Sequence, residues 1–252
     1  MNPMLPALAG LAGLIAAPAY AGPGFFTIGV EPSVFAGGFG YGSNLHVYEL
    51  PLTLRYHGDG WRVSLEVPGL VVSGAGMVTD GAAIRATTQS GTRVGLGDIW
   101  LSGDVTVARA DGLLPELAPY VKLKMPTASR AQGLGTGAPD EEIGLRAIWE
   151  AGKLYPFLRA GYRFVGGAQG LQLHNAPVVE AGLSYRFLPG QYISLAVSHR
   201  GEIQTGAGPS ELALAAYTVQ LTPRLDVQLY ALRGFTPDSP AYGFGLGATA
   251  RF

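Results

Sequence analysis

Charged side chains in this sequence alternate with apolar ones along much of its length. Around Arg62, Ser64 and Glu66, for example, every second residue is polar. In an extended strand, residues two apart lie on one face, so these side chains would share a surface. Charges of both signs on such a face can set the selectivity of a channel lumen, or can pair with one another and fill a narrow one. The candidate pore-lining residues are Glu49, Arg55, Arg62, Glu66, Asp98, Asp104, Lys122, Lys124, Arg146, Arg159, Arg163, Glu180, Arg186, Asp226 and Arg251.

Other residue types that could do chemistry show no recognisable site. The chain has no cysteine, which excludes thiol nucleophiles and thiolate metal ligands. Its four histidines lie far apart without metal-binding spacing. The glycine-rich stretch at 133–137 lacks the following Lys-Ser/Thr pair of a phosphate-binding loop. A net charge of −1 gives no electrostatic basis for binding nucleic acid. We therefore expect no metal, no cofactor and no nucleic-acid partner.

Period-two alternation from Phe25 to Phe252 predicts an all-β chain. Each alternating segment is near the length of about 9–11 residues with which a tilted strand crosses a bilayer. The best helix candidate, Glu211–Tyr217, keeps the alternating register of its neighbours. The twelve predicted strands are 26–36, 46–57, 60–70, 94–109, 114–125, 140–152, 154–166, 176–188, 190–200, 209–221, 224–234 and 241–252.

The connections between these segments alternate in length. Short turns such as 57–60, 110–112 and 188–190 alternate with longer stretches rich in Gly, Ala, Ser and Thr. This alternation is typical of outer-membrane barrels, which have short periplasmic turns and long external loops. The longest connection, 72–93, holds three apolar loop-gate candidates, Met77, Val78 and Ile84. A gate that folds into the mouth is one interpretation of this loop, and a mobile external loop is the other.

Periodicity alone does not decide whether the apolar face meets lipid or packs inside a soluble barrel. The low charged fraction of 14% and the sorting of loops by length favour lipid. So do the aromatic residues near the predicted strand ends, which would form an interfacial girdle. These residues are Tyr48, Tyr56, Trp61, Trp149, Tyr155, Phe164, Tyr185, Phe187 and Phe252.

The N-terminal residues 1–21 are interpreted as a secretory signal peptide that ends in the small-x-small pattern of Ala19-Tyr20-Ala21. A membrane anchor is the alternative, but the segment is short and interrupted by proline. We therefore expect a signal peptide at 1–21. We expect residues 22–252 to form a transmembrane antiparallel up-and-down β-barrel of about twelve strands in the bacterial outer membrane.

Three stretches resemble the outer-membrane transporter family named for the meta-pathway of phenol degradation. They are "GLGDIWLSGDV" at 95–105, "KLKMPTASRAQGLGTGAPDEEIGL" at 122–145 and "AGYRFVGG" at 160–167. Their order matches that of the family, and the resemblance covers most of residues 22–252. It implies an outer-membrane barrel that transports aromatic or other small apolar molecules. It does not imply that phenol itself is the solute.

These observations predict a channel for passive uptake of small, hydrophobic or aromatic compounds, with membrane lipid and a small solute as its partners. The oligomeric state is left open. A structural or adhesive barrel with a filled lumen is the first alternative. The second is a lipid hydrolase, but the adjacent Ser198 and His199 must point to opposite faces, which leaves Ser210 as the serine candidate. We therefore do not expect an enzyme.

Overall fold

The computed structural model describes residues 24–39, 45–79, 82–84 and 90–252, without the side chains of residues 79 and 82–84. The expected signal peptide at 1–21 lies outside the described residues. The strands are β1 Phe25–Val30, β2 Ser33–Gly37, β3 Leu45–His57, β4 Trp61–Ser73, β5 Met77–Thr79, β6 Ala82–Ile84, β7 Thr92–Leu96, β8 Ile99–Val105, β9 Glu116–Met125, β10 Asp140–Ile148, β11 Leu154–Val165, β12 Ala176–Leu188, β13 Gln191–Arg200, β14 Ser210–Thr222, β15 Leu225–Gly234 and β16 Tyr242–Arg251. The described residues contain no helix long and apolar enough to cross a membrane.

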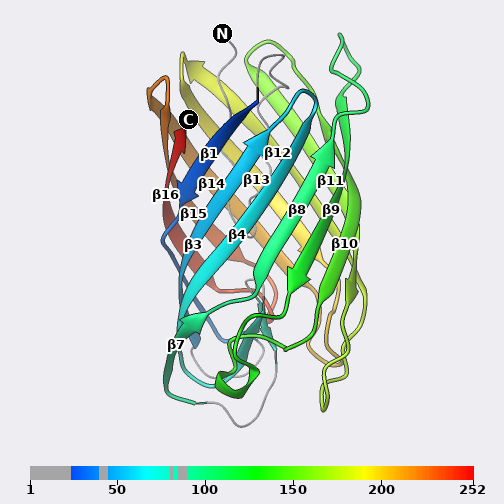
Figure 1. Ribbon diagram of the computed structural model, residues 1–252, viewed down its shortest axis with the longest axis vertical. Coiled ribbons are helices and arrows are strands. Elements are labelled where there is room, and N and C mark those ends of the chain that lie inside the picture. The colour runs from blue at the N-terminus through cyan, green and yellow to red at the C-terminus, as the bar shows by residue number, and fades with distance from the viewer. Residues whose placement is uncertain (1–23, 40–44, 80–81, 85–89) are drawn as a thin grey trace.

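Strands β5 and β6 pair with each other in a separate two-stranded sheet. The other fourteen strands close into a barrel in which each antiparallel neighbour follows in chain order (Figure 1). Closure is made by β16, which pairs with β1 from Thr27↔Arg251 to Val30↔Ala248 and with β2 beyond it. Two wall strands are interrupted, β1–β2 at Glu31-Pro32 and β7–β8 at Gly97-Asp98. When β1–β2 and β7–β8 are each counted as one wall strand, the fourteen strands of the main sheet form a closed barrel of twelve wall strands. The predicted fold class is therefore confirmed.

The apolar face of the wall points outward. Leu246, Leu183 and Val63 are 47%, 40% and 41% exposed on the outer surface. Glu142 and Lys124, by contrast, are 0% and 1% exposed inside the barrel. This polarity is opposite to that of a soluble barrel, because only lipid is a favourable surrounding for a continuous belt of exposed leucine, valine and aromatic residues. The interpretation as a soluble barrel is therefore wrong.

The two ends of the barrel differ as the loop lengths predicted. We call the end with turns 58–60, 149–153, 189–190 and 223–224 the turn end, and the opposite end the loop end. Strand β16 finishes at the turn end, at the top of Figure 1. By the usual orientation of outer-membrane barrels, the loop end faces the outside of the cell.

Two predicted strand boundaries are wrong at the turn end. The predicted strand 94–109 ends at Val105, after which the chain forms a narrow hairpin held by the bridges Ala108↔Leu117 and Asp111↔Leu114. The predicted strand 140–152 ends at Ile148, because residues beyond it turn towards the bridge Ala151↔Leu154. The helix candidate 211–217 is part of strand β14, as its alternation indicated.

Most of the predicted aromatic girdle lies on the outer surface. Tyr48, Trp61, Tyr185 and Phe252 are among its exposed members. Tyr155 is an exception, because it shares the inner face of β11 with Phe157 and Arg159 and is buried against Tyr192, with ring centroids 6.2 Å apart. A strand-end position therefore did not identify the face on which this ring lies.

Inward glycines make room for inward aromatic rings on the neighbouring strand. Tyr230 on β15 is in register with Gly245 on β16, and Phe157 on β11 is in register with Gly182 on β12. A Cβ atom added at either glycine would overlap the facing ring. The alternate glycines of β16 therefore follow from packing inside the barrel, while the apolar residues between them face lipid.

Candidate functional site

The candidate pore-lining residues all lie on strands or strand junctions of the wall, at positions that alternate with the lipid-facing residues. Most of them are buried or half-buried, as expected for side chains inside a cylinder. The structure brings eight of them into ion-pair networks inside the barrel, namely Arg62, Asp98, Asp104, Lys124, Arg146, Arg159, Arg163 and Glu180. Arg55 and Lys122 instead line a cavity between the networks. Arg186 and Arg251 place their guanidinium groups over the rings of Tyr155 and Phe25.

The first network crosses four neighbouring strands. Arg62 on β4 is in register with Asp104 on β8 and donates to its carboxylate from Nε and Nη2 at 2.8–3.2 Å. Arg146 on β10 donates to the same carboxylate at 3.0 Å and to Glu116 on β9 at 3.3 Å. Two arginines and two carboxylates thus neutralise one another inside the wall, which offsets the cost of burying them.

A second network is centred on Glu142 of β10, which is fully buried. Arg163 donates to its carboxylate at 2.6 and 3.0 Å, and the Tyr120 hydroxyl donates at 2.9 Å. Arg159 bridges Glu142 at 3.5 Å and Glu180 at 3.4 Å. Glu142 was absent from the candidate list, although the alternation of β10 places it on the polar face with Arg146.

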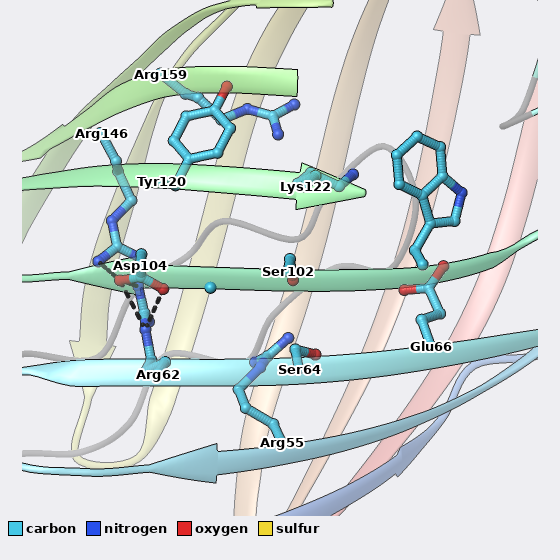
Figure 2. Close-up of a pocket in the computed structure, with 12 residues that line it drawn as sticks. Arg55, Arg62, Ser64, Glu66, Ser102, Asp104, Tyr120, Lys122, Arg146 and Arg159 are labelled. Atoms are coloured by element: carbon cyan, nitrogen blue, oxygen red, sulfur yellow. Dashed lines mark hydrogen bonds and ion pairs between the residues drawn. The ribbon is translucent and has the colours of Figure 1, made fainter. Parts of the chain in front are cut away.

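A cavity of about 90 Å³ opens between these networks inside the barrel (Figure 2). Five of its side chains are cationic and two are anionic. Trp100 and Tyr120 add aromatic surface, and Ser64 and Ser102 add hydroxyl groups. None of these four was a predicted site residue, because the sequence analysis followed charges rather than every inward position. The lining residues are Arg55, Arg62, Ser64, Glu66, Trp100, Ser102, Gly103, Asp104, Tyr120, Lys122, Arg146 and Arg159.

A third network closes the base of the 126–139 loop. The Lys124 Nζ atom lies 2.6 Å from the Asp140 carboxylate and 3.7 Å from that of Asp98. It also donates to the Thr136 hydroxyl at 3.2 Å. Asp98 in turn accepts from the Ala128 backbone N–H at 3.0 Å. Two predicted residues, Asp98 and Lys124, thereby fix the start and end of this loop inside the loop-end mouth together with Asp140, which was not predicted.

The 74–78 segment, which we call the strap, is fastened to the same loop. Arg93 donates to the Gly76 and Gly74 carbonyl oxygens at 2.6 and 3.0 Å, and to that of Gln132 at 3.3 Å. The Val78 N–H donates to the Gly133 carbonyl at 3.0 Å. Arg93 is buried and carries this connection, but the sequence analysis had assigned it no role.

The loop-gate candidates Met77 and Val78 are the last two residues of the strap, and both are buried. Val78 belongs to an apolar cluster with Phe39, Leu70 and Leu134. Met77 belongs to a separate cluster with Ala176 and Ile203. Consecutive residues therefore attach the strap to different sets of loops around the mouth. The side chain of Ile84, the third candidate, lies outside the described residues.

An apolar surface lines another part of the barrel interior. Leu212 and Leu214 of β14 and Leu232 of β15 are buried on the inner face, together with Tyr230. The charged networks, by contrast, lie on β4 and β8–β12. The interior of the described barrel thus has an apolar patch on β14 and β15, with buried polar residues such as Thr218 and Asp226 elsewhere on the same strands.

The residues considered for lipid hydrolysis do not meet. Ser210 is buried on the inner face of β14 and lies 3.1 Å from the Ser239 hydroxyl. His199 is on the opposite face of the wall and pairs with Glu211 at 3.3 Å. Ser198 shares the inner face with Ser194. Within the described part of the chain, His199 therefore has neither of these two serines as a partner.

The described residues also contain no group of three or more histidine, aspartate or glutamate side chains that could hold a metal ion.

No protein-family model and no curated sequence matches the chain. Solved structures do match its fold. An outer-membrane channel of Pseudomonas putida F1 superimposes with a TM-score of 0.69 at 15% identity, covering 93% of this chain and 97% of that one. The NanC porin gives 0.60 at 9% identity, covering 88% and 98%. The CymD monoaromatic hydrocarbon channel gives 0.51 at 9% identity, covering 99% and 96%. The chain therefore has the fold of these bacterial outer-membrane barrels, and its lipid-facing belt locates it in that membrane.

Proposed function

We propose that this protein is a channel through which small molecules cross the outer membrane passively. The observation that carries the proposal is the charged cavity inside a closed barrel whose outer surface is apolar. A barrel that served only as a membrane anchor would have no need for an electropositive chamber in its interior. The fold shared with outer-membrane channels and porins also supports the proposal.

The solute we propose is small and at least partly apolar or aromatic. The buried leucines of β14 and β15 offer such a molecule a surface inside the barrel. The resemblance to the phenol meta-pathway transporter family points to the same class, as does the fold shared with the CymD monoaromatic hydrocarbon channel. Membership of that family is part of this proposal.

A structural or adhesive barrel with a filled lumen is the second candidate. It is favoured by the packing of the strap and the 126–139 loop within the loop-end mouth. In the channel proposal, these segments form a gate that moves to admit solute. We do not favour the hydrolase, because His199 and Ser210 lie on opposite faces of the wall.

The test is reconstitution of the purified protein in planar bilayers and in liposomes. Stepwise increases of current in potassium chloride, together with faster liposome swelling in a small sugar, are the expected results. Protein heated until the barrel unfolds is the control for leakage caused by detergent. A folded protein that inserts but gives neither current nor swelling overturns the channel proposal and leaves the structural barrel.

A further inference from the structure

We infer that the mid-barrel cavity binds the carboxylate group of a small organic acid, held between Arg55 and Lys122. This inference rests on the proposed channel function and names the charge of its solute. It goes beyond the expectation of a small hydrophobic or aromatic compound, because it requires a negative group on the molecule.

The two cations lie in one hydrogen-bonded row of the wall. Arg55 on β3 is in register with Ser64 on β4, which is in register with Ser102 on β8. Ser102 is in register with Lys122 on β9. Adjacent strands are about 4.8 Å apart, so the Cα atoms of Arg55 and Lys122 are separated by roughly 14 Å. The long side chains of Arg55 and Lys122, at the two ends of this row, can both reach a small group that lies in the lumen next to Ser64 and Ser102.

The other cavity cations already have carboxylate partners. Arg62 and Arg146 bind Asp104, and Arg159 binds Glu142 and Glu180. Among the described residues, by contrast, no salt bridge joins a carboxylate to Arg55 or Lys122. Asp104 and Glu66 attract Arg55 only from a longer distance, and Glu142 and Glu180 attract Lys122 in the same way. Lys122 is instead placed over the Trp100 ring, 4.6 Å from its centroid. Two cations in an enclosed, partly desolvated space favour the arrival of an anion.

The chemistry of the row suits a carboxylate. A guanidinium group presents paired N–H donors that match the two oxygens of a carboxylate, and an ammonium group adds a compact positive charge. The hydroxyl groups of Ser64 and Ser102 can each donate one further hydrogen bond. Figure 2 shows Arg55 extending from its strand beside Ser64, with Ser102 on the next strand and Lys122 beyond it. A neutral hydrocarbon would satisfy none of these donors.

The ring of the acid would have aromatic surface within reach. Trp100 and Tyr120 line the same cavity. A volume of about 90 Å³ limits the bound part to a small group. The structure therefore assigns the cavity to a small acid such as an aromatic carboxylate.

The inference is tested with three molecules of similar size and different charge: benzoate, benzyl alcohol and benzylammonium. Their binding to the intact, detergent-solubilised protein is measured by titration calorimetry at a fixed chloride concentration. We expect saturable binding of benzoate and none of the other two over the same range. Equal binding of all three, or no binding of benzoate, overturns the inference.

Variants locate the binding. Arg55→Gln and Lys122→Gln should each weaken benzoate binding by roughly tenfold, because each removes a charge-assisted hydrogen bond. Lys122→Arg should retain binding, since it keeps the charge.

Arg109→Gln is the matched control, because Arg109 is exposed in the 106–115 hairpin and pairs with Asp59 outside the cavity. Heat-dependent mobility in gel electrophoresis verifies that each variant is folded. Unchanged benzoate affinity in folded Arg55→Gln and Lys122→Gln overturns the inference.

Current measurements separate this inference from the channel proposal. Chloride current without benzoate binding would overturn the carboxylate site and leave the channel. Benzoate binding by a folded protein that never conducts would overturn the channel and leave the binding site. If both the carboxylate site and the channel are correct, benzoate should reduce the chloride current of the wild-type protein at concentrations near its dissociation constant. Arg55→Gln and Lys122→Gln should require a benzoate concentration about tenfold higher for the same reduction.

Discussion

Lys124 and Asp140 face each other in register across β9 and β10, with the lysine Nζ 2.6 Å from the carboxylate. Lys124 is the next-to-last residue of β9 and Asp140 is the first residue of β10, so the pair lies at the base of the 126–139 loop. Lys124 is 1% exposed and also reaches Asp98 and Thr136. The buried ammonium group of Lys124 therefore connects the base of the loop at Asp140, the junction between β7 and β8 at Asp98, and Thr136 within the loop itself.

Replacing Lys124 with methionine should release this loop. The change leaves Asp98 and Asp140 buried without their cation, which costs about 3–5 kcal/mol in the free energy of unfolding. We expect a lower unfolding temperature and a larger or longer-lived single-channel current. Lys153→Met is the control, because Lys153 is exposed in a turn at the opposite end of the barrel. Identical thermal unfolding of the two variants would contradict a clamping role for Lys124.

Arg93 offers a second way to loosen the mouth without exposing buried carboxylates. Its guanidinium group holds the Gly74, Gly76 and Gln132 carbonyl oxygens. Arg93→Gln removes most of these donors, so the strap should separate from the 126–139 loop more often. We expect the open fraction of the current to rise several-fold, and Arg109→Gln to behave as the wild type. A channel whose opening is unaffected by Arg93→Gln would show that the strap is not its gate.

The sequence predicted the wall of this barrel well because lipid imposes a strict rule on it. Arg186 and Glu180 had to lie on one face of β12 and Leu183 on the other, since a charge in lipid costs several kcal/mol. The positions at which strands end or are interrupted were predicted less accurately. The interruption at Gly97-Asp98 depends on contacts with the 126–139 loop, including the Thr127 hydroxyl that donates to the Gly97 carbonyl at 3.0 Å. Such a contact has no signature in local alternation.

The interior was predicted less completely than the wall. Alternation identifies which side chains point inward, but the pairing register decides which of them meet. Arg62 and Asp104 are far apart in the sequence, and only the β4–β8 register makes them partners. For the same reason, the sequence could not separate cations that have partners from Arg55 and Lys122. Trp100 and Ser102 could have been found, because they alternate with lipid-facing residues on the same strand as Asp104.

The Tyr230–Gly245 contact predicts an unusual sensitivity of the last strand to small substitutions. A methyl group at Gly245 would overlap the Tyr230 ring, so Gly245→Ala should lower the free energy of unfolding by about 1–3 kcal/mol. Gly247→Ala is a matched control on the same face, since its nearest neighbour would be the flexible Glu31 carboxylate at 3.3 Å. Adding Tyr230→Leu to Gly245→Ala should recover part of the loss. Equal denaturation curves for Gly245→Ala and Gly247→Ala would contradict this account.

The depth of a lipid-facing residue should determine the cost of placing a charge there. Leu158 lies in the middle of β11 and Val105 at the turn-end terminus of β8, and both are exposed on the outer surface. An arginine at the midplane of a bilayer costs about 2–4 kcal/mol, and one near the interface about 0–1 kcal/mol. Leu158→Arg should therefore reduce the free energy of unfolding in lipid vesicles much more than Val105→Arg does. In detergent micelles, where head groups can approach either site, the difference should shrink. The contrast between the two media matters, because a residue packed inside a protein core would be damaged equally in both. Equal losses in vesicles and micelles would contradict the assignment of this surface to lipid, on which every inward position described above depends.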